Sequence, residues 1–184
     1  RSRMLDLEES AKALMKLPAM QFLSAETERA LPALFNDLCE AKLTRLMEPI
    51  VDRLGACLKE SNEALRRRAS GMAAKVLSDG AGPAREILVR RLDAPVSAAA
   101  ATERDDAVFI EVAGAVRAWI GAAAAARQTR PMIAFMAKMV KPDLLKRSSV
   151  IRTAMGATLK MMGALAIDEV SELMSKGDPN LREG

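Results

Sequence analysis

Four carboxylates form the densest group of chemically capable side chains in this sequence: Glu103, Asp105, Asp106 and Glu111. Paired carboxylates can do general acid and base work when their environments separate their pKa values. Three of the four fall on a predicted turn, where such side chains cap the following helix and stay solvated. We therefore interpret the group as turn and capping residues and predict no catalytic residue.

Other side chains that usually do chemistry are scarce. The sequence has no His, which removes the commonest general base and the commonest metal ligand. Its two cysteines, Cys39 and Cys57, lie within apolar helical patterns and are predicted to be buried, reduced thiols. Phosphate-binding glycine loops and the HExxH and CxxC patterns are absent from the sequence. We expect a protein without enzyme activity, metal or cofactor, in a reducing, cytoplasmic location.

The elements that position these residues are predicted to be helices. Hydrophobic residues make up 50% of the 184, with four Phe, one Trp and no Tyr. Ala, Leu and Met dominate and favour helices, whereas strands favour β-branched and aromatic residues. We find no apolar run of the roughly 18 residues that a membrane span needs and no signal peptide pattern. The composition predicts an all-α protein that does not enter a membrane.

Apolar residues at helical spacing, together with caps and breaks, locate the expected helices. Ser24 is expected to cap one helix, and Asp105 or Asp106 another. A helix that begins at Pro83 is expected to end at Pro95, followed by a connection over residues 96–106 that is either an extra helical turn or an exposed insertion. The remaining expected helices cover residues 5–15, 44–58, 60–77 with its preceding turn, 107–120 or as far as 127, 132–140, 150–162 and, beyond Gly163, 167–174.

Three of the apolar stripes repeat at a fixed interval. Leu65, Val108 and Ile151 each lead a similar stripe, and the successive leading positions are 43 residues apart. This interval falls within the roughly 40–47 residues of HEAT and armadillo repeats. The stretch DPNLRE at residues 178–183 also resembles the turn between the two helices of a HEAT repeat.

Residues 42–184 therefore resemble the HEAT/armadillo helical-repeat family. The resemblance implies a HEAT-like solenoid of about four antiparallel helix pairs. We expect residues 1–184 to form a single α-helical repeat domain that is a fragment of a longer chain. The alternative interpretation is a helical bundle without repeats, whose spacing is coincidental.

HEAT arrays generally act as binding scaffolds, so the resemblance implies a non-enzymatic scaffold that binds a protein through its inter-helix turns and an exposed helix face. Within the family, the tubulin-binding TOG domains look similar, because they use Lys, Arg and an aromatic residue on such turns. We predict a positive ridge that binds an acidic partner, possible partners including tubulin. Charge reversal at Arg67 and Arg147 is then expected to weaken binding without changing stability. The residues of the predicted ridge are Arg66, Arg67, Arg68, Lys141, Lys146, Arg147 and Arg152.

A basic stretch keeps nucleic acid open as the alternative partner. Residues 117–152 contain eight Lys or Arg and a single acidic residue, Asp143. Such a region attracts phosphates when its charges share one face. DNA-glycosylase relatives of the HEAT fold would also need aromatic residues in a cleft to hold an extruded base. Trp119 is predicted to lie in the core, which weakens this alternative.

Methionines concentrate in the C-terminal half. We interpret them as core residues, with an adaptable apolar groove for a partner helix as the alternative. They are Met132, Met136, Met139, Met155, Met161 and Met162.

Overall fold

Helices make up almost all of the chain that the computed structural model describes, residues 2–139 and 147–175, and this part contains no strand. The prediction of an all-α protein is confirmed. The helices of the described residues are α1 (Ser2–Lys16), α2 (Ala19–Phe22), α3 (Ala25–Glu40), α4 (Thr44–Cys57), α5 (Glu63–Asp79), α6 (Gly82–Thr102), α7 (Asp106–Ala125), α8 (Thr129–Met139) and α9 (Ser149–Ser175).

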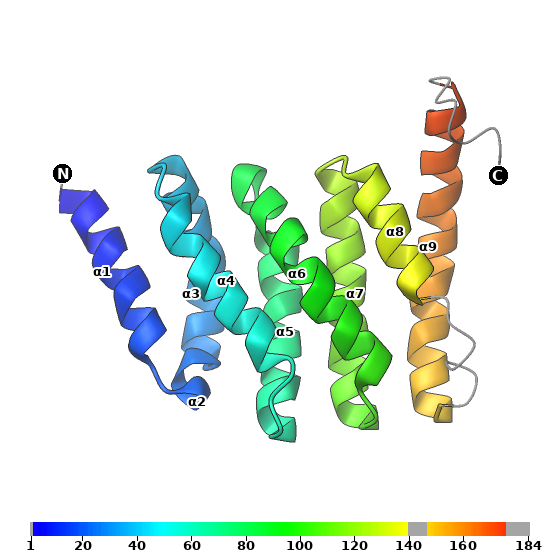
Figure 1. Cartoon of the computed structure of the whole chain (residues 1–184), viewed down its shortest axis with the longest axis horizontal. Coiled ribbons are helices and arrows are strands. Elements are labelled where there is room, and N and C mark those ends of the chain that lie inside the picture. The colour runs from blue at the N-terminus through cyan, green and yellow to red at the C-terminus, as the bar shows by residue number, and fades with distance from the viewer. Residues whose placement is uncertain (1, 140–146, 176–184) are drawn as a thin grey trace.

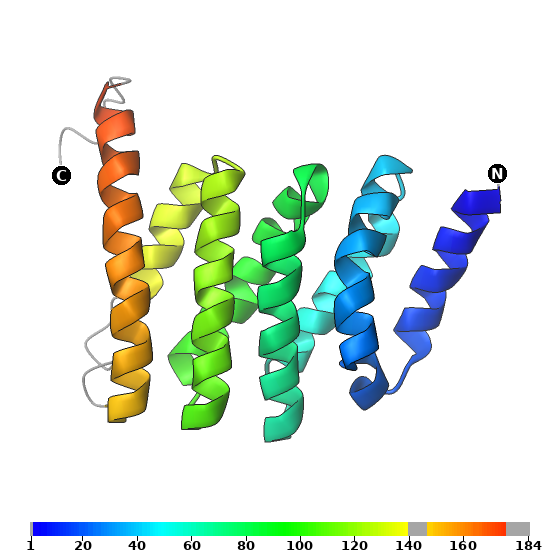
Figure 2. The ribbon, with the colours of Figure 1, turned by 180° about the vertical axis from the view of Figure 1, so that it is seen from behind.

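The longer helices stand in two rows (Figures 1 and 2). Figure 1 shows α1, α4, α6 and α8 in front, and Figure 2 shows α3, α5, α7 and α9 in front. Neighbours within each row contact one another, most extensively α5 with α7 and then α7 with α9, and the rows pack on each other through pairs such as α6 with α7. One continuous core of buried apolar side chains fills the space between the rows. The outward side of the α3, α5, α7 and α9 row, here called the groove face, carries the features described below.

The expected 43-residue interval reappears in the way three helices begin. Asn62, Asp105 and Ser148 each accept, through a side-chain oxygen, the backbone N–H of the residue three positions later. Those three N–H groups belong to the residues that lead the repeated apolar stripes. Side-chain capping satisfies N–H groups that have no partner in the first turn of a helix. The start of α5, α7 and α9 is therefore set by the same chemistry at a constant spacing.

Trp119 lies at the centre of the core, as predicted. Its ring stacks on Phe135 with centroids 4.0 Å apart, and its indole N–H donates to the carbonyl of Val89. These contacts tie α7 to α8 and α6. A buried indole N–H needs a hydrogen-bond partner. The bond to Val89 satisfies this N–H and also fixes the orientation of the ring.

The expectation about membrane-spanning length needs a correction. The α7 helix is long and apolar enough to cross a membrane, with a mean hydropathy of 1.5 over an 18-residue window. The apolar run escapes notice in the sequence because Glu111 and Arg117 interrupt it. Of that window, 56% is buried against neighbouring helices, which is also the behaviour of a core helix. By itself α7 is weak support for a membrane span.

Pro95 does not end a helix, contrary to expectation. The α6 helix passes through it and continues to Thr102, so most of the predicted connection over residues 96–106 is helical. Proline inside a helix removes one hydrogen bond and demands space for its ring. Gly55 of α4 supplies the space, since a Cβ at that position would lie 2.8 Å from the Pro95 Cγ. The Ala-rich segment after Pro95 then favours helix.

Gly163 does not break the C-terminal helix either. The α9 helix runs through it from Ser149 to Ser175. A single glycine in a helix costs about 1 kcal/mol relative to alanine, which the helix-favouring residues on both sides can absorb. Sequence spacing alone therefore overestimated the number of helical segments here.

Candidate functional site

The inter-helix turns were predicted to bind a partner, but Arg66 is engaged within the fold. Its Nε lies 2.8 Å from Glu103 Oε2, and a second nitrogen lies 3.3 Å from the other carboxylate oxygen. It also donates to the backbone carbonyls of Glu60 and Ser61. Arg66 thus joins the turn before α5 to the turn before α7, and its guanidinium has few donors left for a partner.

Glu103 is buried, contrary to the expectation of a solvated turn carboxylate. Only 7% of its side chain is exposed, and its Oε1 accepts the backbone N–H groups of Arg104 and Asp105. Burial alone raises the pKa of Glu103, but hydrogen bonds from Arg66 and from these two N–H groups outweigh burial, so the pKa is lowered. The same hydrogen bond raises the pKa of Arg66.

The other acidic residues of this group have separate structural contacts. Asp105 caps α7, which confirms one of the two expected caps. Asp106 accepts a hydrogen bond from Ser148 at the start of α9. The Oε1 atom of Glu111 lies 4.0 Å from the Nε atom of Arg67. Among the described residues, no group of three or more Cys, Asp or Glu is arranged to hold a metal ion.

Arg147 is also part of the fold and not of an exposed ridge. It donates to the carbonyl of Ala100 at 2.7 Å, and its guanidinium lies over the Phe109 ring, 4.7 Å from the centroid. Burial, followed by the nearby charge of Arg104, lowers the pKa of Arg147. Its Nε and Nη2 are buried without a hydrogen-bond partner among the described residues.

Arg53 repeats this arrangement nearer the N-terminus. It donates to the carbonyls of Leu14 and Leu17 at the end of α1, and its guanidinium lies 4.3 Å from the Phe22 centroid. Carbonyls at helix ends lack partners within the helix, and a cation there also meets the negative end of the helix dipole. Arginines on phenylalanines therefore cap α1 and α6 in the same way.

The remaining residues of the predicted ridge are separated by the fold. Arg67 and Arg68 lie on the exposed side of α5, and 58% of the Arg67 side chain is exposed. Arg152 is exposed on α9. Lys141 and Lys146 lie outside the described residues. The structure thus leaves Arg67, Arg68 and Arg152 on the surface and places Arg66 and Arg147 in structural contacts.

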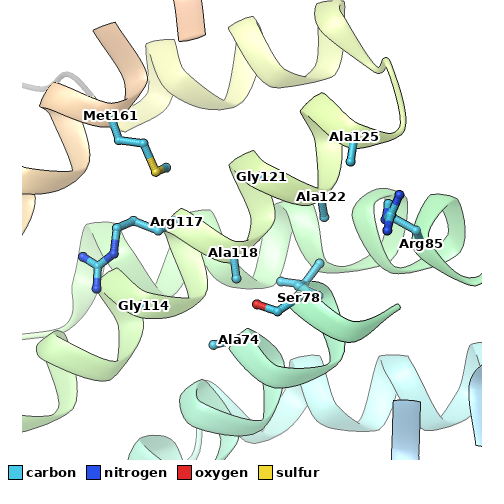
Figure 3. A pocket seen from close by; sticks show the side chains of 11 residues that line it. Ala74, Ser78, Arg85, Gly114, Arg117, Ala118, Gly121, Ala122, Ala125 and Met161 are labelled. Atoms are coloured by element: carbon cyan, nitrogen blue, oxygen red, sulfur yellow. The ribbon is translucent and has the colours of Figure 1, made fainter. Parts of the chain in front are cut away.

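The groove face carries a groove whose Gly and Ala lining was not predicted from the sequence (Figure 3). It has a volume of about 570 Å³ and opens between α5, α7 and α9 near the start of α6. Figure 3 shows Arg117 and Arg85 towards opposite ends of it, with Ala118 and Ser78 between them and Met161 of α9 on another side. Glycine and alanine supply most of its lining. These small residues are Ala74, Gly114, Ala118, Gly121, Ala122 and Ala125.

The glycines of this groove differ from the packing glycines of the core. A Cβ at Gly121 would meet no atom within 4 Å, and one at Gly114 would meet only Arg117 Nη2, at 4.0 Å. By contrast, a Cβ at Gly80 would lie 2.7 Å from a Leu88 methyl carbon. Helical glycine is unfavourable by about 1 kcal/mol relative to alanine. Contacts within the described residues do not require glycine at positions 114 and 121.

A second groove lies on the other side of α5. Its volume is about 510 Å³, and Arg67, Arg68 and Gly71 of α5 line it together with Glu28 of α3 and Glu111 of α7. Charges of both signs line this groove, whereas Arg85 and Arg117 are the charged residues that line the first within the described part of the chain. The two grooves therefore favour different partners.

The described residues of the basic stretch 117–152 do not form one surface. Arg117 lies in the first groove, Lys138 pairs with Asp93 of α6 at 3.0 Å, and Arg147 caps α6. These positions belong to different rows and edges because the stretch spans α7, α8 and the start of α9. The charge that was counted along the sequence is consequently divided in space.

Aromatic and methionine side chains are mostly committed to the core. Trp119 and all four phenylalanines are fully buried, so none can stack on a base or stand on a turn as in TOG domains. Met161 is the exception among the C-terminal methionines discussed above, because it is half-buried and lines the groove. The core interpretation holds for the others, which are Met132, Met136, Met139, Met155 and Met162.

Both cysteines are free. Cys57 is buried and Cys39 is half-buried, with its Sγ 3.8 Å from the Met47 sulfur. Burial raises the pKa of each thiol, although the charge of Arg53 lowers that of Cys57 in part. Thiols with a raised pKa are poor nucleophiles, which fits a packing role.

No protein-family model, curated protein or solved structure matches this chain.

Proposed function

We propose that this chain is a HEAT-like helical-repeat scaffold without enzymatic activity, and that it binds a protein partner on its groove face. The sequence-based prediction placed binding on both the inter-helix turns and an exposed helix face. Because Arg66 and Arg147 are engaged in contacts that join neighbouring turns and helices, the exposed helix face is the better candidate.

The observation that carries this proposal is the open, small-residue groove between α5, α7 and α9. Proteins recognise partner helices in apolar grooves, and close approach of two helices requires small side chains at the contact. Gly114 and Gly121 provide such positions, and their own fold does not need them. A partner that approaches the α7 backbone would offset their unfavourable helix propensity.

Two further features favour a repeat scaffold over an unrelated bundle. The side-chain caps at Asn62, Asp105 and Ser148 keep the 43-residue interval, and the helices stand in two rows with each row in contact along its length. Stacked repeats bury a continuous core and leave long outer faces available for binding.

Cross-linking of a captured partner tests where binding occurs. The immobilised chain would be incubated with lysate of its source organism, treated with an amine-reactive cross-linker and digested for mass spectrometry. We expect partner cross-links at Lys75 of α5 and Lys160 of α9, which are exposed. Cross-links confined to Lys138 in the other row would contradict binding on the groove face.

A gel shift distinguishes nucleic acid from protein as the partner. A scattered basic charge predicts weak, non-specific binding that is lost as salt rises. Duplex or single-stranded DNA that stays bound at moderate salt would overturn the proposed function.

A further inference from the structure

We propose that the groove between α5, α7 and α9 binds an acidic amphipathic helix, whose carboxylates pair with Arg85 and Arg117. This inference rests on the proposed scaffold function and names the chemistry of the partner at that site.

The charge of the groove is uncompensated within the described residues. Arg85 donates its Nε–H to the carbonyl of Gly80 at 3.0 Å, and Arg117 donates to the Thr158 hydroxyl at 3.3 Å. Neither arginine forms an ion pair with a carboxylate of the described part of the chain. Each guanidinium is thus held by one neutral acceptor and retains donors, because arginine carries five N–H groups.

Some arginines between neighbouring helices elsewhere in the molecule have carboxylate partners, whereas Arg53 and Arg147 cap helix ends and lie over phenylalanine rings. Arg91 of α6 contacts both Glu48 and Asp52 of α4, and Arg66 contacts Glu103. Within the described residues, the groove arginines have neither a carboxylate nor a phenylalanine ring as a partner, and they lie at either end of an apolar floor. An acidic ligand would give them the carboxylate partners that the fold supplies to Arg66 and Arg91.

The shape of the floor favours a helix as the carrier of that acid. From Gly114 to Ala125 the positions of α7 that line the groove are Gly or Ala, apart from Arg117. Helices pack at interaxial distances of about 8–10 Å, and the smaller distances require small residues at the contact. Met161 forms a flexible wall that can adapt to the apolar side chains of a partner helix.

Nucleic acid fits the groove less well, although it is also anionic. Trp119 and the phenylalanines are fully buried, so no aromatic ring is available for base stacking. Two arginines separated by an apolar floor offer few contacts for a continuous phosphate backbone. An apolar floor instead favours the apolar face of an amphipathic helix.

The test uses three synthetic helical peptides of about 20 residues, a length that supports helix formation in alanine-based sequences. Each has one Leu/Ala face, and the flanking positions are Glu in one peptide, Gln in the second and Lys in the third. The full chain, labelled with ¹⁵N, is titrated with each peptide. We expect the Glu peptide to bind about tenfold or more tightly than the Gln peptide and the Lys peptide not to bind.

The site and the charge preference are checked together. Amide shifts should centre on Gly114, Ala118 and Gly121. Arg85→Glu combined with Arg117→Glu should invert the preference, so that the Lys peptide binds and the Glu peptide does not. Arg68→Glu is the matched control, since it reverses a charge in the second groove on the same face and should leave the preference unchanged.

Equal affinity for the three peptides, or shifts that map outside the groove, would overturn the inference. Either result, if the lysate partner still cross-links to Lys75 or Lys160, would leave the scaffold proposal intact. Loss of both the peptide preference and the lysate partner would reject the two together. A duplex DNA oligonucleotide that displaces the Glu peptide from the groove would also overturn the inference.

Discussion

Arg66 Nε lies 2.8 Å from Glu103 Oε2, and this ion pair joins the turn that precedes α5 to the turn that precedes α7. The side chains are 21% and 7% exposed, so the pair is far less solvated than an ordinary surface salt bridge. Arg66, which was predicted to recognise a partner, thereby fixes the start of α5 against the start of α7.

Replacement of Arg66 by Ala should destabilise the protein by about 1.5–3 kcal/mol, the range for hydrogen bonds to charged groups. The substitution leaves the buried Glu103 carboxylate without its cation. Urea unfolding at pH 7 measures the effect. Arg67→Ala is the control and should change stability by about 0.5 kcal/mol or less, because its contact to Glu111 is 4.0 Å and exposed. Equal effects of the two substitutions would contradict the structural role of Arg66.

Glu103 should make stability depend on pH in the acidic range. Its pKa is lowered in the folded state, so its stabilising contribution is fully present above the ordinary value of 4.5. As pH falls below that value, the unfolded chain takes up the proton first, and the contribution is lost as pH falls through the folded pKa. The stability advantage of the wild type over Glu103→Gln should therefore be constant near neutral pH and shrink in acid. If the stability advantage of the wild type instead grew in acid, the pKa of Glu103 would be raised in the folded state, which would contradict this prediction.

The sequence predicted the local chemistry well. The Ser24 cap, the Asp105 cap and the burial of Trp119 all follow from residue types and their neighbours. The continuation of α6 through Pro95 could not be predicted, because it depends on Gly55, which is 40 positions earlier in the sequence. Local rules describe a proline in isolation, whereas the packing partner decides whether the helix survives.

In the candidate site, too, contacts between residues distant in the sequence could not be predicted from local residue patterns. Aligned turns of successive repeats suggested a positive ridge, but the partner of Arg66 is 37 positions away and the carbonyl partner of Arg147 is 47 positions away. The groove escaped prediction because glycine and alanine carry no functional group. The groove is recognised only from the structure, which leaves open space beside Gly114 and Gly121 of α7.

Substitution of Gly121 by Ala should stabilise the protein by about 0.5–1 kcal/mol, since alanine is the better helix former and its Cβ meets no atom within 4 Å. Gly55→Ala should destabilise it by about 1–3 kcal/mol, because the added Cβ would lie 2.8 Å from the Pro95 ring. Thermal and urea unfolding of both variants checks the pair. A stabilising Gly55→Ala would contradict the close approach of α4 and α6.

Charge reversal at Arg147 should now be expected to reduce stability, unlike the expectation drawn from sequence alone. The Arg147→Glu variant loses the bond to the Ala100 carbonyl and the contact with the Phe109 ring, at a cost of about 2 kcal/mol or more. Arg67→Glu, on the exposed side of α5, should have little effect on unfolding. Melting temperatures of the two variants, measured by circular dichroism, check this prediction. A lower melting temperature for Arg147→Glu alone supports a structural role for Arg147, and equal melting temperatures would contradict it.

Capture of a partner by groove-filled and control variants tests the central claim most directly. Gly121→Trp fills the groove, whereas Gly156→Trp adds the same ring at an exposed α9 position that also has open space and lies outside the groove. From lysate of the source organism, the wild type and Gly156→Trp should retain a protein that Gly121→Trp does not retain. Retention of the same proteins by all three, or of none by the folded wild type, would contradict it.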